Sequence, residues 1–276
     1  MARPKVLILR VAGTNCDQET AFAFSRAGAV VERVHINQLK SKTKELSRYQ
    51  ILALPGGFSY GDDLAAGKIL ANELKYTLAD ELKDFINKGK LIIGICNGFQ
   101  ILVKAGLLPG NGNLEQEVTL TINDSGKFED RWTYLKKPET SNQPALAKRN
   151  GPGKPEKCVW TQGLPEVMYL PVAHGEGKFM AKDKAVLERL ENNGQVVLRY
   201  CDEKGNPAGY PDNPNGSENA IAGLSDQTGR IFGLMPHPER HSFGWQNPHW
   251  TRQGLKKEGD GLMIFRNGVE YARKLI

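Results

Sequence analysis

Short apolar runs alternate with helical periods along the first 110 residues, and this alternation constrains the fold more than any other feature of the sequence. The apolar runs cover residues 6–11, 30–36, 49–54 and 90–95. Nearly continuous apolar runs are typical of strands buried on both faces, and strands separated by helical segments favour a parallel sheet. The sequence therefore predicts an α/β fold, an open parallel sheet with helices on both faces.

The expected helices follow from apolar spacing and from glycines that end them. Residues 17–27 predict a helix, and Gly28 is placed just past its end. Leucines from Leu70 to Leu82, followed by Phe85 and Ile86, recur at spacings of four and three, which predicts one long amphipathic helix. Ordered signals return at 167–179, and further strands are expected at 196–200 and 231–235.

The length of 276 residues fits one large domain or two small ones. We expect a single domain over residues 1–276, with a surface excursion at about 124–165 and a C-terminal extension at about 241–276. The excursion contains a stretch rich in Pro, Gly and Lys, which is typical of a surface segment. We also expect residues 124–165 and 241–262 to contact a partner protein.

Composition narrows the class of protein. No apolar stretch is long enough for a signal peptide or a membrane span. The four cysteines are scattered without a C-x-x-C pair, which favours a reducing cytoplasm. The net charge of +6 comes from basic residues dispersed among acidic ones, so we expect neither a nucleic-acid nor a membrane partner.

Cys96 directly follows the apolar run 90–95 and has a glycine two positions away on each side, Gly94 and Gly98. This is the spacing of a nucleophile elbow, a sharp turn from strand to helix. A helix beginning at Asn97 would direct its free N–H groups toward the sulfur, which favours a thiolate. An inert buried cysteine is the alternative, but it requires no flanking glycines.

A cysteine nucleophile needs a base and a group that orients the base. His237 lies between two prolines just past an expected strand, and Glu239 is two residues further, so the two side chains can point the same way. The sequence predicts a Cys-His-Glu triad. His241 raises the alternative of a metal pair with His237, but Pro238 disfavours the required helix, and we expect no metal.

The turn Leu54-Pro55-Gly56-Gly57-Phe58 follows another expected strand. Backbone N–H groups in such a turn, together with that of Asn97, can form an oxyanion hole. A simple tight turn is the alternative for this segment.

These residues resemble the class I glutamine amidotransferases, whose glutaminase has a flavodoxin-like α/β fold. The resemblance extends from residue 5 to about 240, through the motifs GTNCD, PGGFSYGDD, CNGFQIL, AHGEG, YPDNPNGS and MPHPER. It implies that Cys96 is the nucleophile, His237 the base and Glu239 its orienter. It also implies that Gly57 lies at the oxyanion hole and that Gln100 helps to hold the substrate glutamine. His174 and Glu176 are expected to have a supporting role in the glutamine pocket or at the partner contact.

The resemblance implies that the chain hydrolyses glutamine to glutamate and ammonia and passes the ammonia to an ATP-dependent synthetase subunit, so that the complex is a ligase. A small auxiliary subunit is a further expected partner. No cofactor is expected in this chain, because ATP and Mg²⁺ belong to the synthetase. There are three alternatives: a glutaminase for a different synthase, another cysteine hydrolase of related fold, and a non-catalytic binding subunit.

The sequence departs from the family pattern at Val11-Ala12, where Phe-Pro is usual in the family.

Overall fold

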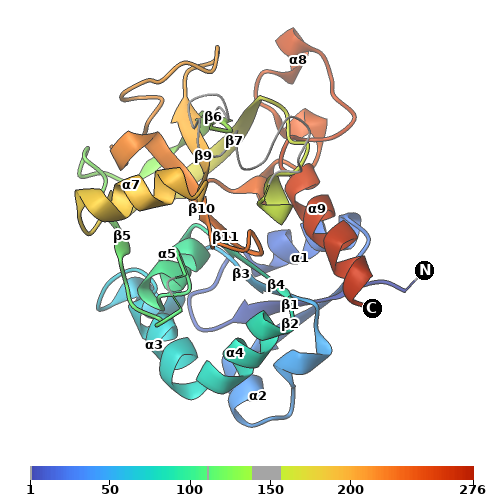
Figure 1. Cartoon of the computed structure of the whole chain (residues 1–276). Coiled ribbons are helices and arrows are strands. Elements are labelled where there is room, and N and C mark those ends of the chain that lie inside the picture. The colour runs from blue at the N-terminus through green and yellow to red at the C-terminus, as the bar shows by residue number, and fades with distance from the viewer. Residues whose placement is uncertain (1, 111, 139–156) are drawn as a thin grey trace.

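A computed structural model describes residues 2–110, 112–138 and 157–276. Its largest element is a nine-stranded sheet with the strand order β2-β1-β3-β4-β11-β10-β9-β6-β7 (Figure 1). Strands β2, β1, β3, β4 and β11 pair in parallel, and each later neighbour pairs antiparallel. The second sheet pairs β5 with β8. The fold is therefore the expected α/β class, with a parallel half and an antiparallel half.

The strands of the large sheet are β1 Lys5–Arg10, β2 Val30–His35, β3 Ile51–Leu54, β4 Leu91–Ile95, β6 Glu129–Lys136, β7 Val167–His174, β9 Val196–Cys201, β10 Ile221–Ser225 and β11 Ile231–Leu234. The small sheet consists of β5 Val118–Thr121 and β8 Lys178–Ala181. The α-helices are α1 Asp17–Arg26, α2 Ile36–Lys40, α3 Lys68–Thr77, α4 Ala79–Asn87, α5 Asn97–Lys104, α7 Lys184–Asn192, α8 Trp250–Gln253 and α9 Leu262–Ala272.

Helices cover both faces of the parallel half, as the sequence predicts. Neighbouring residues of β11 show this directly, because successive side chains of a strand point to opposite faces. Phe232 stacks on Trp160, whose ring also meets the α1 residue Phe24. A Cβ on Gly233 would lie 2.1 Å from Phe99 of α5 on the other face. In Figure 1, α1 and α9 accordingly lie on one side of these strands, and α3, α4 and α5 on the other.

The parallel pairing of β3, β4 and β11 brings three loops together. Leu54 pairs with Gly94 and Leu234 pairs with Ile95, so the three strands end at the same level. Residues that follow parallel strands emerge at one edge of the sheet, where ligands of such folds bind. Strand β4 lies between the other two, so its following residue is flanked by the loops after β3 and β11.

The prediction of one long helix over residues 70–86 is wrong, because the chain forms two helices there. At Leu78 the backbone has φ −116° and ψ 20°, outside the helical region, and this residue ends α3 and precedes α4. The apolar stripe nevertheless continues, since Leu74, Leu78 and Leu82 are all buried. Leucines at helical spacing therefore predicted the buried face but did not reveal the break.

The segments expected at the surface are partly built into the fold. Strand β6 falls in the range 124–165 and pairs with both β7 and β9, and Trp160 is fully buried. Residues 139–156 of that range lie outside the described residues. Among the C-terminal residues, α9 buries Phe265 and Val269 completely. Part of each range therefore belongs to the core, while Trp245 and Leu255 are exposed.

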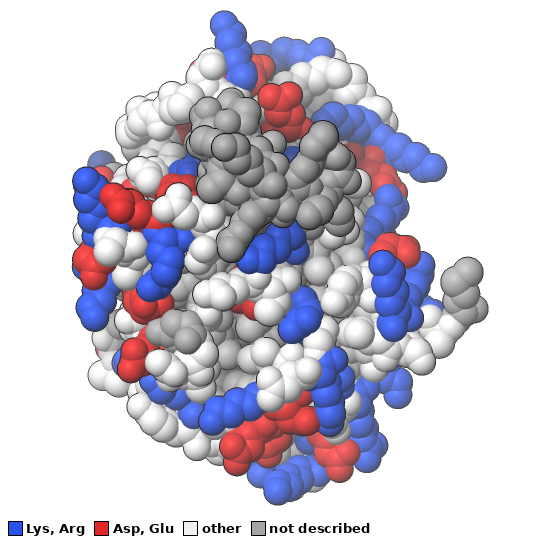
Figure 2. Space-filling model, in the orientation of Figure 1, with Lys and Arg blue, Asp and Glu red and all other residues white. Residues whose placement is uncertain are grey.

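Charged side chains of both signs are interspersed on the face seen in Figure 2. Several basic residues are paired with acidic ones, as in Lys44 with Glu32 and Arg266 with Glu258. No helix within the described ranges is long and apolar enough to cross a membrane.

We expect Phe265→Ala to lower the free energy of unfolding by about 3 kcal/mol or more, because it leaves a cavity in a closely packed core. The Phe265 ring is fully buried and meets Phe24 edge-on at 4.9 Å between centroids. The matched control is Met263→Ala on the same helix, whose side chain is 38% exposed. Urea denaturation measures both, and an equally small loss in the two variants would show that α9 is not part of the core.

Candidate active site

Cys96 occupies a strained turn between β4 and α5. Its backbone has φ 51° and ψ −107°, an unfavourable region for a residue other than glycine. The turn is held by the Cys96 amide, which donates a 2.8 Å hydrogen bond to the Leu234 carbonyl. Strain of this kind is typical of functional positions.

The two glycines beside Cys96 permit close packing that no other residue allows. A Cβ on Gly98 would lie 1.9 Å from the Leu54 carbonyl oxygen, and one on Gly94 would lie 2.5 Å from the Gly98 carbonyl oxygen. Both glycines therefore let α5 approach β3 and β4 closely. This agrees with the physical reason for the nucleophile-elbow spacing.

His237 and Glu239 form a buried pair next to this turn. The distance between His237 Nδ1 and Glu239 Oε1 is 2.6 Å, and the two residues are 2% and 3% exposed. The His237 amide donates to the Pro171 carbonyl at 2.8 Å, which fixes the segment against β7. A carboxylate on Nδ1 orients the ring and leaves Nε2 for proton transfer. The Nε2 atom is buried and makes no hydrogen bond of normal geometry to a described residue.

The charge of the His237 ring is decided by opposing effects. Burial disfavours the imidazolium, but the carboxylate of Glu239 and interactions with the sulfur atoms of Cys96 and Cys16 outweigh burial, so that the pKa of His237 lies well above its ordinary value. The ring is thus a protonated group near neutral pH. It can donate a proton to a leaving group and stabilise a negative sulfur.

The loop after β3 supplies backbone donors on the other side of Cys96. Gly57 has φ 140°, and a Cβ there would lie 2.7 Å from the Gly13 carbonyl oxygen, so glycine is needed at this position. In the described chain, neither the Gly57 amide nor the Asn97 amide donates a hydrogen bond to another protein group. Two unused amides beside Cys96, the predicted nucleophile, are what an oxyanion hole requires.

The side chains of Asn97 and Gln100 connect this loop to α5. Asn97 Oδ1 accepts from the Ser59 amide at 3.1 Å, while its Nδ2 donates to Gln100 Oε1 at 2.9 Å and to Asp62 Oδ1 at 3.2 Å. Gln100 Nε2 donates to the Glu176 carbonyl at 2.5 Å. Gln100 thus lies in the pocket wall with both ends of its amide engaged by protein groups.

His174 ends β7 and is a neutral ring. Burial, and then the charge of His237, lowers the pKa of His174 to about 3. Its Nδ1 is 3.2 Å from Asn123 Oδ1, which also accepts from the Gly177 amide. Nδ1 must carry the proton in this pair, so the buried Nε2, which has no partner among described residues, is an acceptor.

A cavity of about 470 Å³ unites these groups. Cys96, His237, Gly57, Gln100, His174 and Glu176 all line it, so the structure gathers these expected residues around one space, with Asn97 and Glu239 directly behind them. Phe58 and Phe128, which are about half exposed, also line it, with ring centroids 6.4 Å apart.

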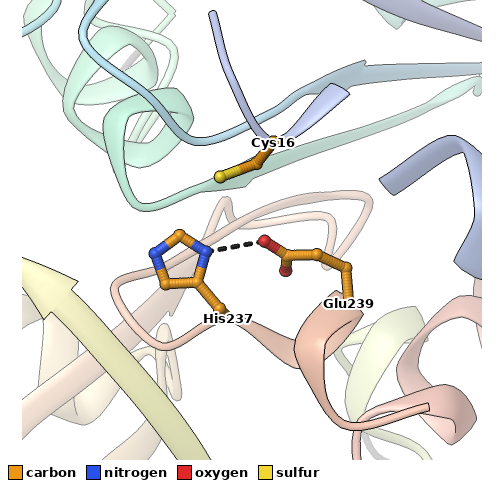
Figure 3. A group of neighbouring side chains, drawn as sticks. All are labelled: Cys16, His237 and Glu239. Atoms are coloured by element: carbon orange, nitrogen blue, oxygen red, sulfur yellow. Dashed lines mark hydrogen bonds and ion pairs between the residues drawn. The ribbon is translucent and has the colours of Figure 1, made fainter. Parts of the chain in front are cut away.

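The sequence analysis did not assign two other lining residues to the site. Cys16 and Arg240 line the cavity, and Arg240 Nη2 donates to Cys16 Sγ at 3.2 Å. Figure 3 shows Cys16 approaching the His237–Glu239 pair from the side opposite to their backbone. Burial raises the pKa of the Cys16 thiol, so it is neutral near pH 7. Cys16 lies within the GTNCD motif and Arg240 within the MPHPER motif. Membership of these motifs was the sequence signal that could have assigned both residues to the site.

Comparison with known proteins identifies the class of protein to which this chain belongs. Residues 3–272 match the family model of the CobB/CobQ-like glutamine amidotransferase domain. The chain belongs to this family of glutamine amidotransferases and is an enzyme. The resemblance inferred from the motifs is thereby confirmed.

Similar curated proteins point to one kind of enzyme within this family. The chain is 49% identical to phosphoribosylformylglycinamidine synthase subunit PurQ of Dehalococcoides mccartyi, with 100% of both chains covered. It is 44% identical to the subunit of that name from Archaeoglobus fulgidus, with 98% of each covered. Among solved structures, PurLQS from Thermotoga maritima contains a chain that matches with a TM-score of 0.70 and 29% identity, covering 98% of this chain and 99% of that one.

We expect Gly98→Ala to lower the melting temperature by about 5 °C or more, because the new methyl group overlaps the Leu54 carbonyl and must push α5 away from β3. Gly209→Ala is the control, since a Cβ there has no neighbour within 4 Å. Thermal unfolding followed by circular dichroism compares them. Equal melting temperatures would contradict the close packing at the elbow.

We expect Glu239→Gln to lower the pKa of His237 by roughly one unit or more, because the substitution removes the negative charge that favours the imidazolium. NMR titration of the imidazole measures the midpoint. Glu270→Gln, which removes an exposed carboxylate paired with Arg273, is the control and leaves the midpoint unchanged. A midpoint that stays high in Glu239→Gln would mean that Glu239 does not set the charge of the ring.

Proposed function

We propose that this chain is the glutaminase subunit of phosphoribosylformylglycinamidine synthase, which hydrolyses glutamine to glutamate and ammonia for an ATP-dependent synthetase partner. The strained Cys96 elbow beside the buried His237–Glu239 pair is the observation that carries the proposal. The PurQ relatives, of which 100% and 98% of the length is matched, support the synthase to which such a glutaminase belongs.

Cys96 is the proposed nucleophile. Its thiolate attacks the side-chain amide carbon of glutamine, and the proton held on His237 Nε2 passes to the departing ammonia. A γ-glutamyl thioester remains on Cys96. His237, now neutral, takes a proton from water, which attacks the thioester and releases glutamate. Glu239 keeps Nδ1 protonated throughout and so holds the ring in one orientation.

The unused amides of Gly57 and Asn97 are the proposed donors to the oxyanion that forms in both steps. The carboxylates of Asp62 and Glu176, which belong to cavity-lining residues, provide the negative charge that suits the α-ammonium group of glutamine. The neutral His174 Nε2 is an acceptor for an N–H of the substrate. Gln100 is proposed to hold the cavity wall that contacts the substrate.

The synthetase subunit is the proposed partner, and ATP and Mg²⁺ are proposed to bind there and not to this chain. The solved structure of PurLQS from Thermotoga maritima supports an assembly with other synthase subunits. A small auxiliary subunit is proposed as a further partner. Exposed residues beside the site, such as Phe58 and Phe128, are available for subunit contact. A cytoplasmic location is part of the proposal, because all four cysteines are free thiols.

The test measures glutamate release from glutamine by the chain mixed with its synthetase, with and without ATP and formylglycinamide ribonucleotide. We expect turnover that the synthetase substrates stimulate, and a loss of roughly a thousandfold or more in Cys96→Ala, because the nucleophile is removed. Cys201→Ser, which changes a buried cysteine of β9 outside the cavity, is the control and retains turnover.

Equal glutamate release by wild type and Cys96→Ala would exclude Cys96 as the nucleophile. Turnover that depends on Cys96 but ignores the synthetase and its substrates would support a glutaminase serving another synthase.

A further inference from the structure

Cys16, His237 and Glu239 form a group with the composition of a metal site. One possible ligand atom from each lies within 4.8 Å of the other two, and all three residues are buried. It is the only such group that the described residues contain. Thiolate, imidazole and carboxylate are the ligands that bind Zn²⁺ in proteins. The catalytic pair therefore has a thiol beside it that the proposed reaction does not use.

A second observation at this group points to a cation. Glu239 Oε2 is buried and accepts no hydrogen bond from any described residue, although its partner oxygen Oε1 pairs with His237. Buried carboxylate oxygens are ordinarily satisfied. An acceptor of this kind, on a carboxylate that lies beside a thiol and an imidazole, has the lone pair that a divalent cation requires.

We propose that a thiophilic divalent cation, of which Zn²⁺ is the probe, binds reversibly between Cys16 Sγ, His237 Nδ1 and the Glu239 carboxylate, and that it inhibits the enzyme. The inhibitory consequence rests on the proposed glutaminase function. The binding itself does not.

Binding replaces two protons. The Cys16 thiol releases one proton and becomes a thiolate, and the imidazolium releases the proton that Nδ1 shares with Glu239. The charges of thiolate and carboxylate then balance the 2+ charge of the metal. Arg240 Nη2 donates to Cys16 Sγ at 3.2 Å, which suits a metal-bound thiolate. The positive charge of Arg240 is itself paired with Glu19, since Arg240 Nε lies 3.5 Å from Glu19 Oε1. Water from the cavity completes four ligands, since Cys16 and His237 both line that space.

The metal would stop the reaction because it prevents His237 from acting as a base. When Nδ1 binds the metal, Nε2 keeps its proton and has no lone pair, so His237 cannot accept a proton from the water that attacks the thioester. Cys96 needs no direct contact with the metal. The inhibition is therefore expected to reverse when a chelator removes Zn²⁺.

Isothermal titration of the purified chain with Zn²⁺, without glutamine or partner, tests the site. We expect one Zn²⁺ per wild-type chain, the same in Cys201→Ser and in Cys96→Ala, since the three ligands remain. Cys16→Ser is expected to weaken binding tenfold or more, because a neutral hydroxyl replaces the thiolate. Co²⁺ is the spectroscopic probe, and its absorption should include a thiolate-to-metal band that Cys16→Ser removes.

A parallel measurement gives the fraction of each variant's own glutaminase rate that Zn²⁺ removes and a chelator restores. We expect the Zn²⁺ concentration for half inhibition to rise tenfold or more in Cys16→Ser. Absence of Zn²⁺ binding, equal affinity in Cys16→Ser, or loss of binding in Cys96→Ala would each overturn the site. Metal binding without any glutaminase activity would instead leave the site intact and refute the proposed function.

Discussion

The parallel pairing of β4 with β3 on one side and β11 on the other is the constraint on which the site depends. Because the three strands end at the same level, the residues that follow them meet without any long loop. Cys96 follows the middle strand, Gly57 follows β3 and His237 follows β11. The groups proposed as nucleophile, oxyanion donor and base are thus separated by the spacing of neighbouring strands, about 5 Å.

This arrangement holds only because the backbone at the sheet edge is tightly packed. Gly98 lies against the Leu54 carbonyl, and Cys96 is held at a positive φ by a hydrogen bond to Leu234. The same packing buries the His237–Glu239 pair, where the nearby charges overcome the cost of burying an imidazolium. Close packing also brings Cys16 to this pair, so the proposed metal would bind two groups proposed for catalysis, His237 and Glu239, together with a thiol that the reaction does not use.

Short-range patterns in the sequence predicted the strands that are marked by their own apolar residues. The strands β1, β3 and β4 lie where apolar runs mark them, since a strand buried on both faces needs such a run. The edge strand β2 also lies where it was predicted, although most of its residues are exposed. The break at Leu78 was missed because leucine spacing reports a buried face and not backbone continuity. Strand β6 was missed because its partners β7 and β9 come more than 30 residues later in the chain, and only that pairing makes it a strand.

By itself, the sequence determined which residues are proposed for the chemistry, Cys96, His237 and Glu239, because the glycine spacing and the i, i+2 pair are short-range patterns with a direct mechanical meaning. The tertiary structure decided which groups gather around that chemistry. Cys16 and Glu239 are more than 200 residues apart, and Asn97 reaches Asp62 and Ser59 only across the interface of α5 with the β3 loop. Such contacts depend on how strands and helices pack, which no local pattern encodes.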